Sequence, residues 1–191
     1  MDLGQTAAQI LGFSVTSGVV TFGLNWGLSS YRERAARNLE TEHMALRVAL
    51  AFEKFAIDCG TLLSEAGTYQ ASSGSAGAPI SELPEIRLPT RIDWKRLDHA
   101  ITNRALSFEN LIKYGNGAID FESGYSDPDE PLEQGLLQAG RCGHRAVLLA
   151  EELRAMHNLP AAELPSSVWD FRKFLKEQHD KYEAQVAEYN E

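Results

Sequence analysis

The opening of this chain constrains its fold more than any other segment. Between Leu3 and Ser30 no side chain is charged, and Arg32, Arg34 and Arg37 follow directly. An uncharged stretch of this length can cross the hydrocarbon core of a bilayer as one helix. Its glycines and polar residues dilute the apolarity, but a backbone in lipid satisfies itself by helical hydrogen bonding whatever the helix propensity. We therefore predict a membrane anchor at the N-terminus.

The charges around this segment predict its direction. Basic residues follow the anchor, residues 1–30, and no Lys or Arg precedes it, so the part after the anchor is expected in the cytoplasm. We predict a single-pass protein of the cell membrane whose cytoplasmic domain is residues 31–191. Two other interpretations stay open: a cleaved signal peptide, which normally has the basic start that this chain lacks, and a helix buried in a soluble core, an oligomer or a partner.

Two glycines in the anchor predict a contact between helices. Gly23 and Gly27 form a GxxxG pair, a spacing that lets two membrane helices approach closely. The alternative is a chance pair accommodated in a lone span. Self-association through helices is therefore one expected partnership, beside binding to another protein.

The charge distribution disfavours anionic partners. The chain has a formal net charge of −9, and residues 126–191 hold 13 acidic and 7 basic side chains, which gives −6. Such a surface repels phosphate backbones, so we expect no nucleic acid among the partners. Cys59 and Cys142 lie far apart and form no CxxC motif, which suits a reducing compartment and predicts two small buried side chains.

Beyond the anchor the sequence has the periodicity of packed helices. From Tyr31 to Ala66 there is no proline and one glycine, so we expect the span to continue into a long cytoplasmic helix. Its apolar residues recur at spacings of three and four, as on a helix that packs along a seam. The residues of this seam are Val48, Phe52, Phe55, Cys59, Leu62 and Ala66. Our candidates for helix–helix contacts among them are Val48, Phe52, Phe55 and Leu62. The seam serves either a partner helix or the chain's own bundle.

A loop and a second helix are predicted next. Residues 67–90 are rich in Ser, Gly, Ala and Pro, a composition typical of a flexible loop. Thr90 and Asp93 have the spacing of a capping box, which predicts that the second helix starts there. Gly115 and Gly117 predict its end.

Two further helices complete the predicted architecture. Residues 127–131 combine acids and prolines as the first turn of a helix does, and Ser167 with Asp170 has capping-box spacing for the last helix. No segment shows the strict alternation of a strand. We therefore predict an all-α protein, in which an N-terminal transmembrane helix continues into a cytoplasmic bundle of about four helices.

Glycines inside the third helix predict a close neighbour. Gly135, Gly140 and Gly143 each cost on the order of 1 kcal/mol relative to Ala within a helix. A backbone packed tightly against another element would explain them, and a local break in the helix is the alternative. In the last helix Trp169 and Phe174 fall off the main apolar seam. We expect both to be buried in the core, with a contact to another protein as the alternative.

The sequence holds no recognisable catalytic or cofactor motif. It lacks a glycine-rich phosphate loop, HExxH, paired CxxC motifs and GxSxG. Cys142 and His144 come nearest to a reactive cluster, but residues two apart on a helix point about 200° away from each other. We predict no cofactor, no metal and no small-molecule ligand.

Together these features predict a function by binding. We favour a non-enzymatic, membrane-anchored helical interaction protein, which acts as a scaffold, an adaptor or a regulatory subunit of a membrane complex. One alternative is an enzyme with a site assembled from scattered histidines and acids, for instance around His144 or His157. The other is a soluble helical oligomer in which the N-terminal helix is buried.

Overall fold

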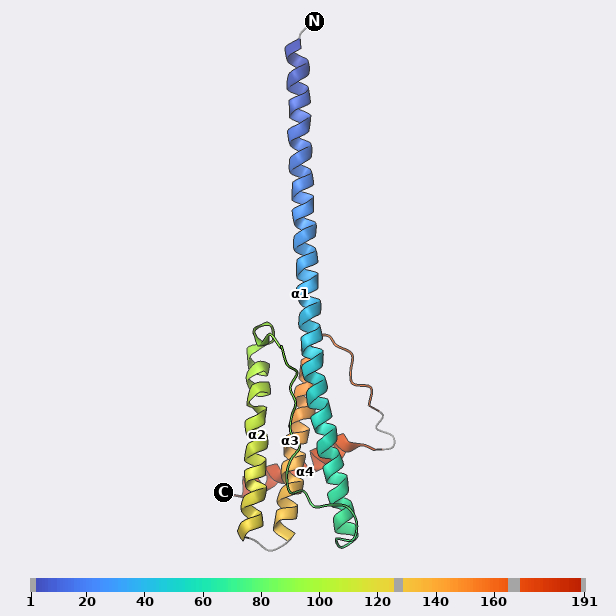
Figure 1. The fold of residues 1–191 in the computed structure, drawn as a ribbon, viewed down its shortest axis with the longest axis vertical. Helices are drawn as coiled ribbons and strands as arrows, with labels where there is room; N and C mark the ends of the chain where they lie inside the picture. The colour runs from blue at the N-terminus through green and yellow to red at the C-terminus, as the bar shows by residue number, and fades with distance from the viewer. Residues whose placement is uncertain (1–2, 126–128, 165–168, 190–191) are drawn as a thin grey trace. The chain divides into compact units, whose positions relative to one another are not determined.

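The computed structural model describes the backbone of residues 3–125, 129–164 and 169–189, and the side chains of residues 36–124, 131–164 and 169–188. Over these residues the chain is all-helical, with four α-helices and no strand (Figure 1). The helices are α1 (Leu3–Ala71), α2 (His99–Tyr125), α3 (Asp129–Met156) and α4 (Phe171–Tyr189), with a short 3-10 helix, η1 (Trp94–Arg96), before α2. The all-α prediction is confirmed, and the arrangement is consistent with a helical bundle.

The chain forms two compact units, Met1–Thr41 and Glu42–Glu191. Across the described residues, no helix combines the length and the apolarity that crossing a membrane requires. The predicted anchor, residues 1–30, lies outside the residues whose side chains are described, and so does its Gly23 and Gly27 pair. The anchor therefore stays a prediction.

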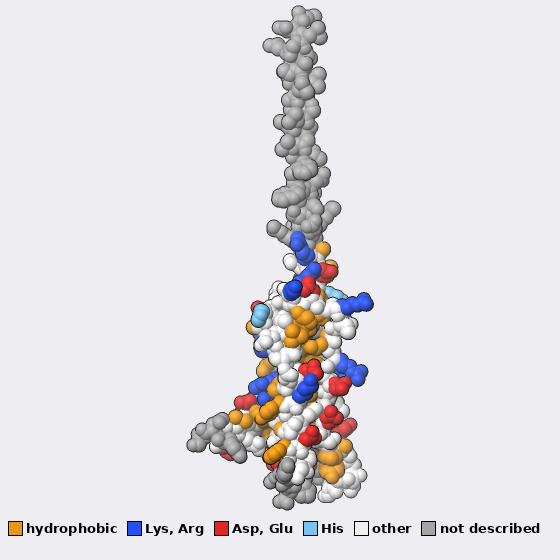
Figure 2. Space-filling view, turned by 60° about the vertical axis from the view of Figure 1, so that its left-hand side comes forward, with side chains coloured by type: hydrophobic (Ala, Val, Ile, Leu, Met, Phe, Trp, Pro, Cys, Tyr) orange, Lys and Arg blue, Asp and Glu red, His pale blue; other side chains and the backbone are white. Residues whose placement is uncertain are grey.

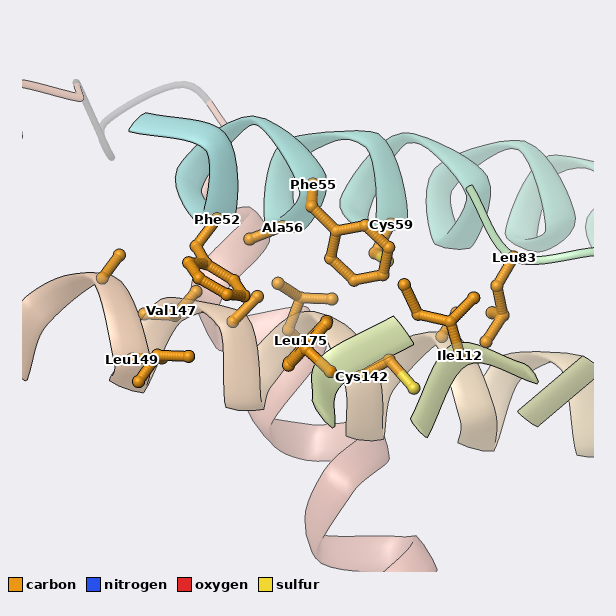
Figure 3. Packing of buried hydrophobic residues seen from close by; sticks show 14 of the residues in the cluster. Phe52, Phe55, Ala56, Cys59, Leu83, Ile112, Cys142, Val147, Leu149 and Leu175 are labelled. Carbon is orange, nitrogen blue, oxygen red and sulfur yellow. The ribbon is translucent and has the colours of Figure 1, made fainter. Parts of the chain in front are cut away.

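One hydrophobic core holds the second unit together. The ring of Phe108 on α2 meets the rings of Phe52 and Phe55 on α1 edge-on, with centroids 5.0 and 5.3 Å apart. Leu153 of α3 and Leu175 of α4 are fully buried in the same cluster, which Figure 3 shows from close by. This core therefore joins all four helices. Burying a side chain of this size stabilises the fold by about 1.5–3 kcal/mol.

The second helix differs from its prediction at both ends. Asp93 caps only η1, through the Lys95 amide at 3.3 Å, and α2 begins later, where Asp98 Oδ1 accepts from two amides of its first turn. The predicted stop at Gly115 and Gly117 is wrong, because α2 continues to Tyr125. Tertiary contacts override the low helix propensity of glycine here: Ile119, one turn beyond, is 1% exposed and anchors the distal half of α2 in the core.

The remaining helix ends follow local chemistry. α3 begins at Asp129, within the acid and proline cluster that predicted it. For α4 the predicted capping box is corrected: Asp170 is the N-cap itself, and its Oδ1 accepts from the Lys173 amide at 3.2 Å. Ser167, the other half of the predicted box, lies outside the described residues.

The segment expected to be a flexible loop over residues 67–90 divides into two parts. Its first residues still belong to α1, which ends at Ala71. Further on, Ile80 and Leu83 are each only 3% exposed, and the Leu83 amide donates to Asn116 Oδ1 of α2 at 2.8 Å. This second part is therefore packed onto the helices, although it forms no regular structure.

Candidate interaction surface

The seam predicted on α1 lies in the chain's own core. Val48, Phe52 and Phe55 are at most 1% exposed, and Leu62 is partly buried against the same cluster. In Figure 3 the two phenylalanines point from α1 toward α2 and α3. These side chains make helix–helix contacts within one molecule, so a partner has to be sought on another surface.

In the second unit α1, α2 and α3 pack on one another and leave three grooves on the outside. α1 contacts α2 through Phe52 and Phe108, and it contacts α3 where Cys59 faces Gly143. α2 and α3 also pack on each other. Three mutually packed helices leave one outer groove between each pair of neighbours. Each of these grooves is either covered by another part of the chain or open.

The groove between α1 and α3 is covered by α4. A Cβ at Gly60 of α1 would lie 2.8 Å from Phe171 Cβ, and a Cβ at Gly140 of α3 would lie 3.0 Å from the backbone carbonyl carbon of Gln178. A Cβ at Gly143 would overlap Leu175. The glycines thus let α4 approach both helix backbones, as predicted for Gly140 and Gly143, and α3 is unbroken at these positions.

The groove between α1 and α2 is covered by residues 78–98. Arg47 of α1 donates to the Thr90 carbonyl at 3.4 Å, and Leu83 reaches α2 through the hydrogen bond to Asn116. The apolar side chains of this segment are buried or partly buried against the core: Ile80, Leu83, Ile86, Leu88, Ile92, Trp94 and Leu97. A non-helical segment therefore takes the place that a further helix has in a regular bundle.

The groove between α2 and α3 stays open. It encloses about 510 Å³, and its apolar lining is Phe108, Leu111, Leu148 and Leu149. Leu148 is 49% exposed, and Leu111 is partly buried. Figure 2, in which the left-hand side of Figure 1 comes forward, shows hydrophobic side chains exposed in several places on the helical domain. We call the open groove lined by residues of α2 and α3 the α2–α3 groove.

Positive charge borders the α2–α3 groove. Arg104 of α2 and Arg145 of α3 both belong to its lining, together with Ser107 and Asn110. Arg104 Nη2 lies 2.6 Å from Glu152 Oε1, and this hydrogen bond is the main cause of the raised pKa of Arg104. Arg145 is exposed and makes no hydrogen bond or ion pair within the described part of the chain. The chain as a whole has a net charge of −9, so the two arginines that border the apolar lining of this groove differ in sign from the overall charge.

Cys142 and His144 lie in different surroundings, and the ring of His144 lies beside the ring of His179. Cys142 is fully buried, and burial raises the pKa of its thiol to about 11. The His144 ring lies 4.9 Å from the His179 ring of α4, between centroids. Burial lowers the pKa of both imidazoles. Among the described residues, no group of three or more His, Cys, Asp or Glu side chains is arranged to hold a metal ion.

The sequence interpretation missed the residues of this surface. Leu148 of α3 and Leu111 of α2 each stand next in sequence to a buried residue, Val147 and Ile112, so they lie at the side of the buried stripe of their helix. Large apolar residues outside a buried stripe were the available signal. The same signal was noted for Trp169 and Phe174, for which burial in the core was expected. That prediction is wrong, because the two side chains are 37% and 51% exposed.

Comparison with known proteins adds no relative. No family model matches the chain, no curated protein matches it, and no solved structure matches it.

Proposed function

We propose that this chain is a membrane-tethered helical protein that works by binding another protein, as a scaffold, adaptor or regulatory subunit. The observation that carries the proposal is the α2–α3 groove. Two of the three grooves around the core are covered by the chain itself, through α4 and residues 78–98, whereas the third is open and leaves Leu148 about half exposed. Exposed apolar surface bordered by polar residues is typical of protein interaction sites.

The tether is supported by the sequence of the first unit. Its uncharged segment over residues 3–30 is long enough to span a bilayer, and the arginines that follow favour a cytoplasmic domain. A tether would hold the α2–α3 groove at the membrane surface, where it would meet membrane-bound partners at a raised effective concentration.

An enzyme is the rival from another class. It would need a histidine and a carboxylate within hydrogen-bond reach in a deep pocket. His179 Nδ1 lies 3.9 Å from Glu183 Oε1, beyond that reach, and the α2–α3 groove has no histidine in its lining. The cavity between α1 and residues 82–87 has none either. These observations give the rival no support.

Two measurements on the full chain test the proposal. After an alkaline carbonate wash, the chain should stay in the membrane pellet, and a variant lacking residues 1–30 should move to the supernatant. A photocrosslinking amino acid in place of Leu148 should then give a discrete protein adduct in membranes. The matched control is the same amino acid in place of Ser64, which is exposed on α1. A soluble full chain would refute the tether, and equal crosslinking from both positions would refute the binding surface.

A further inference from the structure

We propose that the α2–α3 groove binds an amphipathic helix of a partner protein whose apolar stripe is flanked by carboxylates. This inference rests on the proposed function, because it names the chemistry of the partner that the groove would take.

The α2–α3 groove has a lining into which a further helix could pack. Its residues recur along α2 as Arg104, Phe108 and Leu111, at spacings of four and three, so the groove follows two turns of that helix. On α3 the lining includes Arg145 and Leu149, which lie four residues apart. A floor formed by two neighbouring helices accepts the side-chain ridge of a third helix.

The α1–α3 groove shows how this chain fills such a seat. There α4 inserts Phe171, Leu175 and Gln178, which are spaced four and three residues apart. The α2–α3 groove is therefore expected to take a ligand with apolar side chains at positions i, i+3 or i+4, and i+7. A helix satisfies its own backbone hydrogen bonds, so it can lie on the leucines of the floor without leaving backbone groups unpaired.

Charge selects an acidic helix. Arg145 has no ion-pair partner within the described residues, and the guanidinium of Arg104 stays about half exposed beside Glu152. A carboxylate at the edge of the incoming stripe would pair with Arg145, and a basic side chain there would meet like charge. Ser107 and Asn110 supply further hydrogen-bonding groups along the same edge.

The test uses the full chain in lipid nanodiscs, so that detergent does not fill the groove. The probes are three fluorescent helical peptides of about five turns with the same leucine stripe and with glutamate, glutamine or lysine at the flanks. Fluorescence anisotropy should give the order glutamate, glutamine, lysine, with about tenfold between the first and the last. Arg145→Glu should invert this order, and Leu148→Asp should abolish binding of all three.

Controls keep this result specific to the groove. Arg87→Glu makes the same charge change on an exposed side chain of the segment that covers α1 and α2, and it should leave all three affinities unchanged. Arg145 and Leu148 are exposed, so the far-ultraviolet circular dichroism of both variants should match that of the parent.

The outcomes that overturn the proposal differ from those that overturn the function. The acidic-helix proposal is wrong if no peptide binds saturably, or if Arg145→Glu leaves the order of affinities unchanged. In either case, a discrete crosslink from Leu148 would still support a binding function with a partner of other chemistry. If Leu148→Asp instead dissociates an oligomer measured by light scattering, the occupant is a second copy of this chain. Loss of both peptide binding and crosslinks would remove the function as well.

Discussion

The guanidinium of Arg154 on α3 holds the carboxylate of Glu53 on α1 through two hydrogen bonds, Nε to Oε1 at 2.6 Å and Nη2 to Oε2 at 3.1 Å. The two side chains are only 10% and 12% exposed. Arg154 also donates to the carbonyl of Pro160, beyond the end of α3. One side chain thereby joins two helices and a connecting segment, and the ion pair with Glu53 raises the pKa of Arg154.

Removing one partner of this ion pair should lower the stability of the chain more than replacing both partners. Glu53→Ala leaves a buried cation without its partner, so the free energy of unfolding should fall by about 3 kcal/mol or more. The double variant Glu53→Met with Arg154→Met removes both charges and should lose clearly less. Chemical denaturation followed by circular dichroism measures both. The exposed pair of Lys54 and Asp58 is the control, and Lys54→Ala should cost less than about 1 kcal/mol. Equal losses for Glu53→Ala and Lys54→Ala would contradict the assignment.

The docking of α4 makes Gly140 sensitive to a single methyl group. In Gly140→Ala the new Cβ would overlap Gln178 and lie within 3.1 Å of its backbone, so we expect a loss of about 1–3 kcal/mol in unfolding free energy. Gly117→Ala is the matched control on α2, because nothing lies within 4 Å of its Cβ position. There the same substitution should stabilise the chain by up to about 1 kcal/mol through helix propensity. Opposite signs in thermal unfolding are the expected result, and stabilisation by both would refute the close approach.

Stability should fall as the pH is lowered through the range where histidine titrates. Burial lowers the pKa of His144 and of His179 below 6.5, so near that pH the unfolded chain binds protons that the folded chain does not. The charged groups around the pair are Arg145 and Glu151 on α3 and Lys176, Asp180 and Glu183 on α4.

The denaturation midpoint should therefore be lower at about pH 5.5 than at about pH 7.5, with the decline flattening once both folded imidazoles are protonated. Replacing both His144 and His179 with Gln should reduce this difference. His99 is exposed, so His99→Gln should retain it. A midpoint that rises on acidification would show that the carboxylates around the pair dominate instead.

The two thiols should be inert in the folded chain. Burial raises the pKa of Cys59 well above its ordinary value and that of Cys142 to about 11, and both side chains are fully buried. A thiolate is the reactive form, so a disulfide reagent at about pH 8 should modify neither residue under native conditions. Both should react after unfolding in denaturant. Rapid modification of either one in the native protein would show that the core around Gly143 opens on the time scale of the assay.

Self-association through the anchor has its own test. Gly23→Ile and Gly27→Ile put a β-branched side chain where two helices would cross closely, so each should abolish a crosslinked dimer formed in membranes. Gly18→Ile is a control within the same uncharged segment and outside the GxxxG pair. A dimer that persists in both variants would mean that the anchor does not drive assembly, and a parent without a dimer would refute the prediction entirely.

Much of the helical pattern could be predicted because its causes are local. The spacing of Val48, Phe52 and Phe55 placed one face of α1 in the core, and the acids and prolines before Leu132 located the start of α3. Where local signals competed with distant contacts, the predictions failed. α2 passes through Gly115 because the distal half of the helix is anchored in the core, and Leu83 lies 2.7 Å from the position that a Cβ would occupy there.

The sequence by itself determined the helical periodicity, because the spacing of apolar residues along one helix is a local property. It also predicted two buried cysteines, and at Gly140 and Gly143 it left a choice between a close neighbour and a helix break, which the contacts with α4 decided. Only the tertiary structure decided which apolar stripe stays uncovered. Which of the three grooves α4 and residues 78–98 cover depends on the lengths of the connecting loops and on steric fit across many residues. The pairing of His144 with His179, and the opening of a leucine floor beside Arg145, follow from that outcome and leave no local pattern in the sequence.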